Sequence, residues 1–343
     1  NKDFFVIHYM DQSTNSQYEA VTVTANVNQY EKVLENRLEE FISPNKNLDT
    51  DNIIKSFNVL NGEWLLRLAS EERHSPNKKI LREKLSIISA FKESLGLLDA
   101  ADIFWVPVSL EEILRVSTMV GLKQSEGMFS SKNLGQAGPT SDDLLFMGID
   151  YSNARLKVHL LPVEVKIGNN DSNVTAKAIQ QVNHTADILK EYLSDDNVDN
   201  FTKLFYRNFF RSVLTTNLEK LTGSRLVDMD DSFEMKLPDI MDDLTTGRYD
   251  VSFDLQDIYR KGIVFEFTRD VSNRSAMVDN SHNVTLVKVP EQDAYDYVDI
   301  DVTSVVSKIQ KGEFDFPDGM LLSRFNGKKT LKENYHKQVS YYE

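Results

Sequence analysis

Three charged residues, Asp143, Glu164 and Lys166, have the types and spacing of a site that cuts phosphodiester bonds. Glu164 and Lys166 lie two positions apart in the apolar run 161–168, LPVEVKIG, and alternate residues of a strand point to one face. Asp143 precedes a second apolar run, 144–149, and lies 21 positions before Glu164, a gap that fits a hairpin. Antiparallel pairing of the two runs would bring Asp143 beside Glu164.

Two converging carboxylates suit a hard cation such as Mg²⁺ or Mn²⁺, which takes oxygen ligands and keeps several waters. Such an ion lowers the pKa of a bound water and neutralises charge on a phosphate under attack, and a neighbouring lysine can orient or deprotonate that water. The chain has no Cys, which excludes disulfides, thiolate zinc sites and a cysteine nucleophile, and its 6 His residues show no metal-ligand spacing. A Glu-x-Lys triplet is also common as a solvated ion pair on an exposed strand face, so the residues alone admit both interpretations.

Other candidates lie close to these residues in the sequence. Asp142 competes with Asp143 for the role of the acid before the strand. Gln180 and Gln181 fall on a predicted helix after the second strand.

A basic stripe follows further along the chain. Lys203, Arg207 and Arg211 recur every four residues on a predicted helix, with aromatic residues around them. They could follow a DNA backbone, and a solvated helix face explains the same spacing.

The elements that must position these residues follow from the periodicity of apolar residues. The predicted strands are 4–9, 20–27, 103–108, 144–149, 155–167, 249–253, 262–267, 284–289 and 295–302. The predicted helices are 29–42, 53–68 (one helix or a pair), 79–98, 109–122, 174–193 and 198–221. The pattern predicts three regions: an N-terminal α/β region 1–99, a core region 100–222 and a β-rich, acidic region 223–343.

The net charge of −14 for 343 residues disfavours nucleic acid as a partner, because duplex binding depends on Lys and Arg that neutralise phosphates. The distribution of charge changes this conclusion. Residues 121–215 hold 10 basic and 11 acidic residues, whereas residues 216–343 hold 16 and 24. The candidate site therefore lies in a nearly neutral stretch, and the acidic surplus indicates a subunit-facing or regulatory C-terminal region.

No apolar run approaches the ~18 residues of a membrane helix and no secretion signal opens the chain, so we expect a soluble, cytoplasmic protein without a membrane partner.

Asp143, the triplet Glu164-Val165-Lys166 and the Gln-bearing helix after it resemble the PD-(D/E)xK nuclease superfamily, with Asp142 in place of the Pro of that name. A second resemblance covers residues 53–170 best. It is to the DptH (DndH) family, which are large proteins of restriction systems that depend on DNA phosphorothioation. The segments that carry it are 61–68 (NGEWLLRL), 105–117 (WVPVSLEEILRVS) and 129–135 (FSSKNLG), continuing through Lys166.

The superfamily resemblance implies an α/β (α+β) fold with an αβββαβ core and a mixed sheet. Asp143, Glu164 and the Val165 backbone carbonyl would bind Mg²⁺ or Mn²⁺, and Lys166 would be the catalytic lysine. In the superfamily an acid on the first core helix often joins the metal ligands, a part that Glu111 or Glu112 could play. The resemblance also implies that Gln180 or Gln181 could contact a metal-bound water or the DNA backbone, although for each glutamine taken singly an exposed helix amide is the simpler interpretation.

Both acids also have ordinary explanations. Glu112 completes a capping box with Ser109, and Glu111 can pair with Arg115 one helical turn later.

The region 223–343 would complete the sheet or dock an ATPase domain.

The DptH resemblance implies a Mg²⁺-dependent DNA endonuclease module of an antiphage restriction complex, with DNA and other subunits as partners. Proteins of this family are thought to include an ATPase motor, and the chain begins at Asn1 rather than Met, so we expect a fragment or a processed product. Two other classes stay open: a catalytically inactive nuclease-like scaffold that binds DNA or subunits, and a pure assembly module that docks a motor domain.

Overall fold

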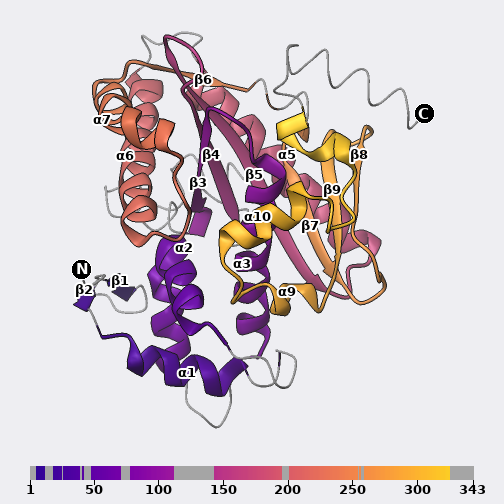
Figure 1. Cartoon of the computed structure of the whole chain (residues 1–343). Helices are drawn as coiled ribbons and strands as arrows, with labels where there is room; N and C mark the ends of the chain where they lie inside the picture. Colours follow the sequence, from indigo (N-terminus) through magenta and orange to yellow (C-terminus); the bar gives the residue numbers. More distant parts are fainter. Residues whose placement is uncertain are drawn as a thin grey trace.

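The computed structural model describes residues 5–11, 18–24, 26–38, 41, 48–70, 78–111, 143–194, 201–253, 255 and 259–324. Within these residues the chain has a mixed α/β fold (Figure 1). The strands are β1 (Phe5–Asp11), β2 (Tyr18–Thr24), β3 (Ile103–Ser109), β4 (Leu144–Asp150), β5 (Leu156–Gly168), β6 (Tyr249–Ser252), β7 (Ile263–Thr268), β8 (Ser275–Asp279) and β9 (Val284–Pro290). The helices are α1 (Asn28–Leu38), α2 (Thr50–Ser70), α3 (Lys78–Leu98), α5 (Ser172–Leu193), α6 (Phe201–Ser224), α7 (Asp231–Thr246), α9 (Asp293–Asp296) and α10 (Val302–Gln310), with 3-10 turns η1 (Asp318–Met320) and η2 (Leu322–Arg324).

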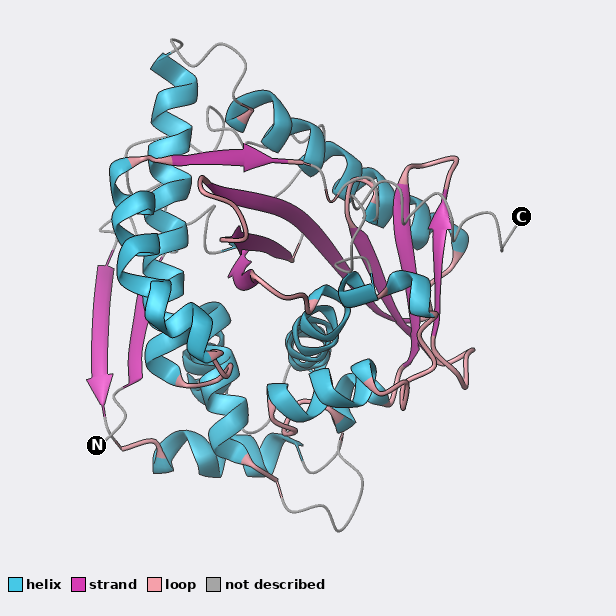
Figure 2. Ribbon diagram, turned by 45° about the horizontal axis from the view of Figure 1, so that its top comes forward, coloured by secondary structure: helices cyan, strands magenta, loops and turns pink. Residues whose placement is uncertain are grey.

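One mixed sheet organises the described residues. Its strand order is β3-β4-β5-β7-β9-β8, and β6 also pairs with β5. Strands β3, β4 and β5 form an antiparallel meander, β6 and β7 run parallel to β5, β9 runs parallel to β7, and β8 is antiparallel to β9. The β1–β2 ladder is separate from this sheet and lies beside the N-terminal helices (Figure 2).

Helices cover both faces of the sheet. Figure 1 shows α3 and α10 on one face and α5 on the other. The α5 side has its own small apolar cluster, in which α5 packs on the strands β7 and β9. The main core is a single connected cluster of buried side chains that extends from Tyr30 in α1 to Leu322 in η2. The predicted region boundaries near residues 100 and 222 stay predictions.

Strand β5 changes its partner at Pro162. Its ladder with β6 ends at His159 and its ladder with β7 begins at Val163. The Val165 amide points toward the β4 side, where it donates a hydrogen bond, so the amide position of Pro162, three residues earlier, faces the opposite side. Proline has no N–H to donate. On this side of β5, neither β6 nor β7 pairs with position 162, so no ladder hydrogen bond is lost there.

Most predicted elements are confirmed, with ends shifted by a few residues. Residues 53–68, predicted as one helix or a pair, lie within α2, which is interrupted at Asn61 (φ −162°, ψ 103°). The described part of the expected β-rich region also contains three helices, α7, α9 and α10. The predicted strand 295–302 is wrong: α9 ends at Asp296 and α10 begins at Val302, so the aromatic and β-branched residues there pack as helix ends and a turn. Of the predicted helix 109–122, only its beginning lies within the described residues.

Helix α7 and strand β8 were not predicted from the sequence. The α7 segment carries Pro238 and an acidic surface that obscure its periodicity. Its ends nevertheless have clear signals: Asp230 caps the first turn by accepting from the Phe233 amide at 2.6 Å, and Gly247 ends the helix at φ 77°.

In the described part of the chain, none of the helices combines the length and the apolar character that crossing a membrane requires.

Helix α3 is attached to the C-terminal segment by a fully buried lysine. The Lys92 side chain is 0% exposed, and its Nζ donates to the Val298 carbonyl at 2.6 Å and to the Ile300 carbonyl at 2.7 Å. A buried backbone carbonyl needs a hydrogen-bond donor because it has no contact with water, and the Lys92 ammonium group supplies that donor here.

We expect Lys92→Met to lower the free energy of unfolding by about 3 kcal/mol, because it keeps the apolar stem but leaves buried carbonyls without a donor. Lys79→Met is the matched control on the same helix: its side chain is 84% exposed, and we expect a change within about 0.5 kcal/mol. Urea unfolding followed by circular dichroism measures both. Equal costs for the two variants would contradict this account of Lys92.

Candidate functional site

Strand β5 places Glu164 and Lys166 on the same face of the sheet, under helix α5. Glu164 is 2% exposed and forms a direct ion pair with the partly exposed Lys166. Gln181 of α5 is 6% exposed, and its Oε1 accepts a hydrogen bond from Lys166 Nζ at 3.3 Å. The lysine ammonium is thus held between a strand carboxylate and a helix amide.

Asp143 is joined to this triplet through the backbone of β5. It comes directly before β4, whose first residue Leu144 pairs with Val163. The Val165 amide donates to Asp143 Oδ2 at 2.9 Å, so the carboxylate continues the β4–β5 ladder one step beyond the strand. The Leu110 amide donates to the Asp143 carbonyl at 3.2 Å, which fixes the residue from the β3 side as well.

The electrostatic surroundings of Asp143 are mixed. Burial raises the pKa of its carboxyl group, and the charge of Glu111 acts in the same direction. The Lys166 and Lys84 ammonium groups and the Val165 amide favour the charged form, and burial outweighs them. A further cation nearby would stabilise the charged form of this buried carboxyl group.

Glu111 lies near Asp143 but is already held by two other residues. Its Oε2 accepts from Trp64 Nε1 at 3.0 Å and from Lys84 Nζ at 2.8 Å, and Lys84 lies 4.2 Å from the centre of the Trp64 ring. These partners come from α2 and α3, so Glu111 links both helices to the site. The other acids of this group, Glu112 and Asp142, lie outside the described residues, as does the expected partner Arg115.

The orientation of α5 separates the two candidate glutamines. Gln181 faces the sheet and contacts Lys166, whereas Gln180 is exposed to solvent. Neighbouring helix positions differ in direction by about 100°. Only Gln181 therefore joins the candidate site.

Glu266 is a neighbour of the site that we did not predict. It lies opposite Lys166 in the parallel β5–β7 register and is 1% exposed. Thr175 of α5 donates its hydroxyl to Glu266 Oε1, and Lys288 of β9 lies 3.7 Å from Glu266 Oε2. The available signal was an acid within an otherwise apolar strand, IVFEFT, but the sequence does not reveal that β7 would pair with β5.

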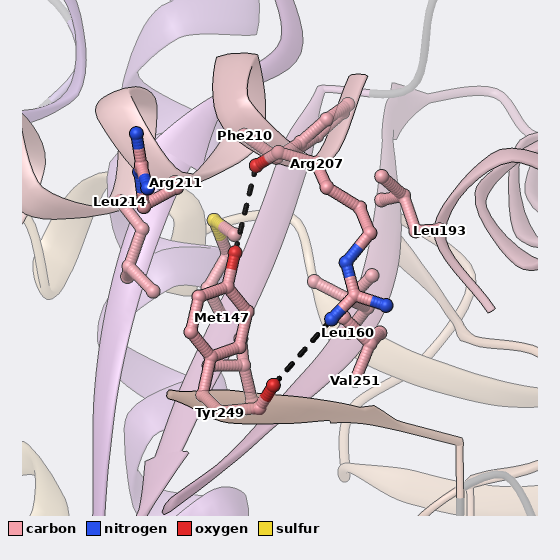
Figure 3. Close-up of a pocket in the computed structure, with 10 residues that line it drawn as sticks. Met147, Leu160, Leu193, Arg207, Phe210, Arg211, Leu214, Tyr249 and Val251 are labelled. Carbon is pink, nitrogen blue, oxygen red and sulfur yellow. Dashed lines mark hydrogen bonds between the residues drawn. The ribbon is translucent and has the colours of Figure 1, made fainter. Parts of the chain in front are cut away.

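The basic stripe on α6 is far from this site. Figure 3 shows Arg207 and Tyr249 joined by two hydrogen bonds beside a small apolar pocket, at 3.4 and 3.5 Å. Arg211 lines the same pocket, and Lys203 Nζ donates to Ser194 Oγ at 3.4 Å. Tyr249 pairs with Leu156, ten positions before Lys166 on β5, which corresponds to roughly 33 Å along the strand. The structure does not bring these three basic residues together with Glu164 and Lys166.

The oxygen ligands available to a cation at this site are few. Among the described residues, no group of three or more His, Cys, Asp or Glu side chains is arranged to hold a metal ion. A cation here would depend on the carboxylates of Asp143 and Glu164 and on backbone oxygen.

Comparison of the chain with protein-family models, with curated protein sequences and with solved structures found no match, so the site is interpreted from its geometry.

We expect Asp143→Asn to change how stability depends on pH. The pKa of Asp143 is raised in the folded state, so its contribution to stability is fully present below the unfolded pKa of about 3.9 and is lost as pH rises through the folded pKa. Relative to the variant, the wild-type protein should therefore lose unfolding free energy as pH rises above about 4, measured by urea unfolding without divalent metal. Asp187→Asn removes an exposed carboxylate that is paired with Lys261 and is the control for the loss of one acid elsewhere on the chain. A parallel pH profile for wild type and Asp143→Asn would contradict the raised pKa.

Proposed function

We propose that the chain is a metal-dependent deoxyribonuclease module that hydrolyses phosphodiester bonds with Asp143, Glu164 and Lys166. The observation that carries the proposal is the hydrogen bond from the Val165 amide to Asp143. It joins the acid that directly precedes β4 to the backbone of the Glu-x-Lys triplet on β5, and this contact supports the PD-(D/E)xK interpretation. The contact of Lys166 with Gln181 adds the Gln-bearing helix to the same group.

The order of the elements supports this interpretation. Among the described elements, helix α3, strands β3, β4 and β5, helix α5 and strand β7 occur in the order αβββαβ. Residues 112–142, between β3 and β4, lie outside the described residues, and α6, α7 and β6 come between α5 and β7. The three antiparallel strands and the parallel β7 form a mixed sheet between α3 and α5.

The residues present fit a hard divalent cation. Asp143 and Glu164 offer carboxylate oxygens, which Mg²⁺ and Mn²⁺ prefer. The amide and the carbonyl of one strand residue point to the same side, so the Val165 carbonyl is directed toward the edge on which Asp143 lies. The bound ion would neutralise charge on the phosphate and lower the pKa of a water.

The side chains themselves position the reactants. Lys166 carries a positive charge that can offset the charge of a phosphate and donate hydrogen bonds to the attacking water. Glu164 and Gln181 hold its ammonium on both sides, which fixes where those donors point. Burial raises the pKa of the Asp143 carboxyl group, and a bound cation would favour its charged form.

The sequence resemblance to DptH extends the proposal to a biological role. In that role the module cuts DNA in an antiphage restriction system that depends on DNA phosphorothioation, in the cytoplasm. DNA and other subunits would be its partners, and an ATPase would be supplied by another part of the complex.

An inactive nuclease-like scaffold is the second candidate function. The observation that favours it is that Glu111 already has protein partners in Lys84 and Trp64, and that Lys166 is paired with Glu164. In a purely structural site the charged groups neutralise one another in this manner. The scaffold would bind DNA or subunits without cutting DNA.

We expect Lys166→Ala to reduce cleavage of duplex DNA in Mg²⁺ or Mn²⁺ by at least about 100-fold, because it removes the group that positions the water and offsets phosphate charge. DNA binding, measured by fluorescence anisotropy, should stay within about threefold of wild type. Lys157→Ala, at the other end of β5, is the matched control and should cleave like the wild type. Cleavage by Lys166→Ala at the wild-type rate would reject the enzymatic role, and absence of cleavage in the wild type would favour the scaffold.

We expect Mn²⁺ to raise the thermal unfolding temperature of the wild-type protein but not that of Asp143→Asn or Glu164→Gln. A ligand at 100 times its Kd adds about 2.7 kcal/mol to the unfolding free energy. The shift should increase as pH rises, because the Asp143 proton competes with the cation and burial raises the pKa of that carboxyl group. Asp187→Asn is the control and should keep the wild-type shift. An equal shift in all variants would place the bound Mn²⁺ elsewhere.

A further inference from the structure

Two arginines share one buried carboxylate at the carboxyl ends of the parallel strands. Arg82 of α3 donates through Nη2 to Glu291 Oε1 at 2.8 Å, and Arg269, directly after β7, donates through Nε to Glu291 Oε2 at 2.6 Å. Glu291 follows β9 and is 8% exposed. Tyr295 completes the group: its hydroxyl accepts from Arg82 Nε at 3.0 Å and donates to Glu291 Oε1 at 3.1 Å.

The two guanidinium groups line an open cavity. Two adjoining depressions of about 400 and 500 Å³ both have Arg82 and Arg269 in their walls. The last residues of three parallel strands, Gly168, Thr268 and Pro290, lie along their rim. In open α/β sheets, this end of the strands is where ligands bind.

The charge of the cavity is positive. Arg82, Arg269 and Lys79 face two acids, Glu291 and Glu83, so one positive charge remains. Burial opposes the charged form of Glu291, but the hydrogen bonds from Arg269 and Tyr295 and the charges of both arginines hold its pKa below the usual range, so this acid stays charged and offsets one of the two arginines. The acidic surplus of residues 216–343 therefore does not extend to this place.

Hydrogen-bond donors remain on both arginines. Among the described residues, the bonds of Arg82 and Arg269 use Nε and Nη2. The Nη1 groups are left to other partners, and the Arg269 side chain is 70% exposed. Gly168, at φ 111°, lets the strand backbone approach closely, because a Cβ there would lie 3.3 Å from Arg82 Nη2.

We propose that the cavity of Arg82 and Arg269 binds a phosphate group. Guanidinium groups match the oxygens of a phosphate with paired donors, and Glu291 and Tyr295 hold the Arg82 group in a fixed orientation. The phosphate has two sources: the backbone of a DNA strand that continues past Lys166, two residues from Gly168 on β5, or a free phosphate compound. Binding at the cavity does not depend on the proposed nuclease activity.

Titration calorimetry of the full chain with inorganic phosphate tests the proposal. We expect Arg269→Ala to weaken binding at least about tenfold, because it removes charged donors from the cavity. Glu291→Gln keeps the shape of the carboxylate but removes its competing charge, so it should tighten binding severalfold. Arg248→Ala, at an exposed arginine that also pairs with two acids, is the matched control and should bind like the wild type.

Opposite effects of Arg269→Ala and Glu291→Gln separate binding from a structural role, because damage to the fold would weaken binding in both. Absence of phosphate binding in the wild type, or equal binding by wild type and Arg269→Ala, would overturn the proposal. A duplex DNA arm, read by fluorescence anisotropy in EDTA, identifies the source. If phosphate competes with DNA and Arg269→Ala weakens both, the DNA backbone is the ligand; if only phosphate binding weakens, a free phosphate compound is.

The same measurements keep the two proposals apart. Lys166→Ala should bind phosphate like the wild type whatever its cleavage rate. Loss of phosphate binding with cleavage intact would remove this inference alone, and phosphate binding in a wild type that does not cleave DNA would remove the nuclease proposal alone.

Discussion

The hydrogen bond between the Val165 amide and the Asp143 carboxylate decides the geometry of the candidate site. It extends the β4–β5 ladder by one side-chain step, and so ties the acid to a backbone whose alternate residues are Glu164 and Lys166. Everything else is arranged around that strand: α5 brings Gln181 over Lys166, and α2 and α3 bring Trp64 and Lys84 to Glu111. Most of these partners are buried or half-buried, so each is held by packing as well as by its polar contact.

The wider sheet depends on a change of partner within β5. Pro162 has no amide to donate, and β6 stops before it while β7 starts after it. Gly262, just before β7, is needed for this approach, because a Cβ there would lie 2.5 Å from the Pro162 carbonyl oxygen. Parallel pairing then places Glu266 beside Lys166 and brings the ends of β5, β7 and β9 to one edge, where the arginine cavity lies.

The sequence predicted the elements that have local signals and missed what depends on long-range pairing. Asp143, Glu164 and Lys166 could be linked because a hairpin spans few residues and a strand alternates its faces. The choice of Gln181 over Gln180 needed the rotation of α5 against the sheet, and Glu266 needed the pairing of strands about 100 residues apart, which no local pattern encodes. In the segment 295–302 a local signal was misleading. Its aromatic and β-branched residues are typical of a strand, but in the structure they belong to the ends of α9 and α10 and the turn between them.

Helix α3 contributes to three separate places with side chains of its own. Arg82 reaches the cavity at the strand ends, Lys84 reaches Glu111 beside the candidate site, and Lys92 holds the carbonyls that precede α10. A continuous helix of 21 residues spans about 31 Å. One helix therefore connects the cavity at the strand ends, the surroundings of the candidate site and the segment that precedes α10.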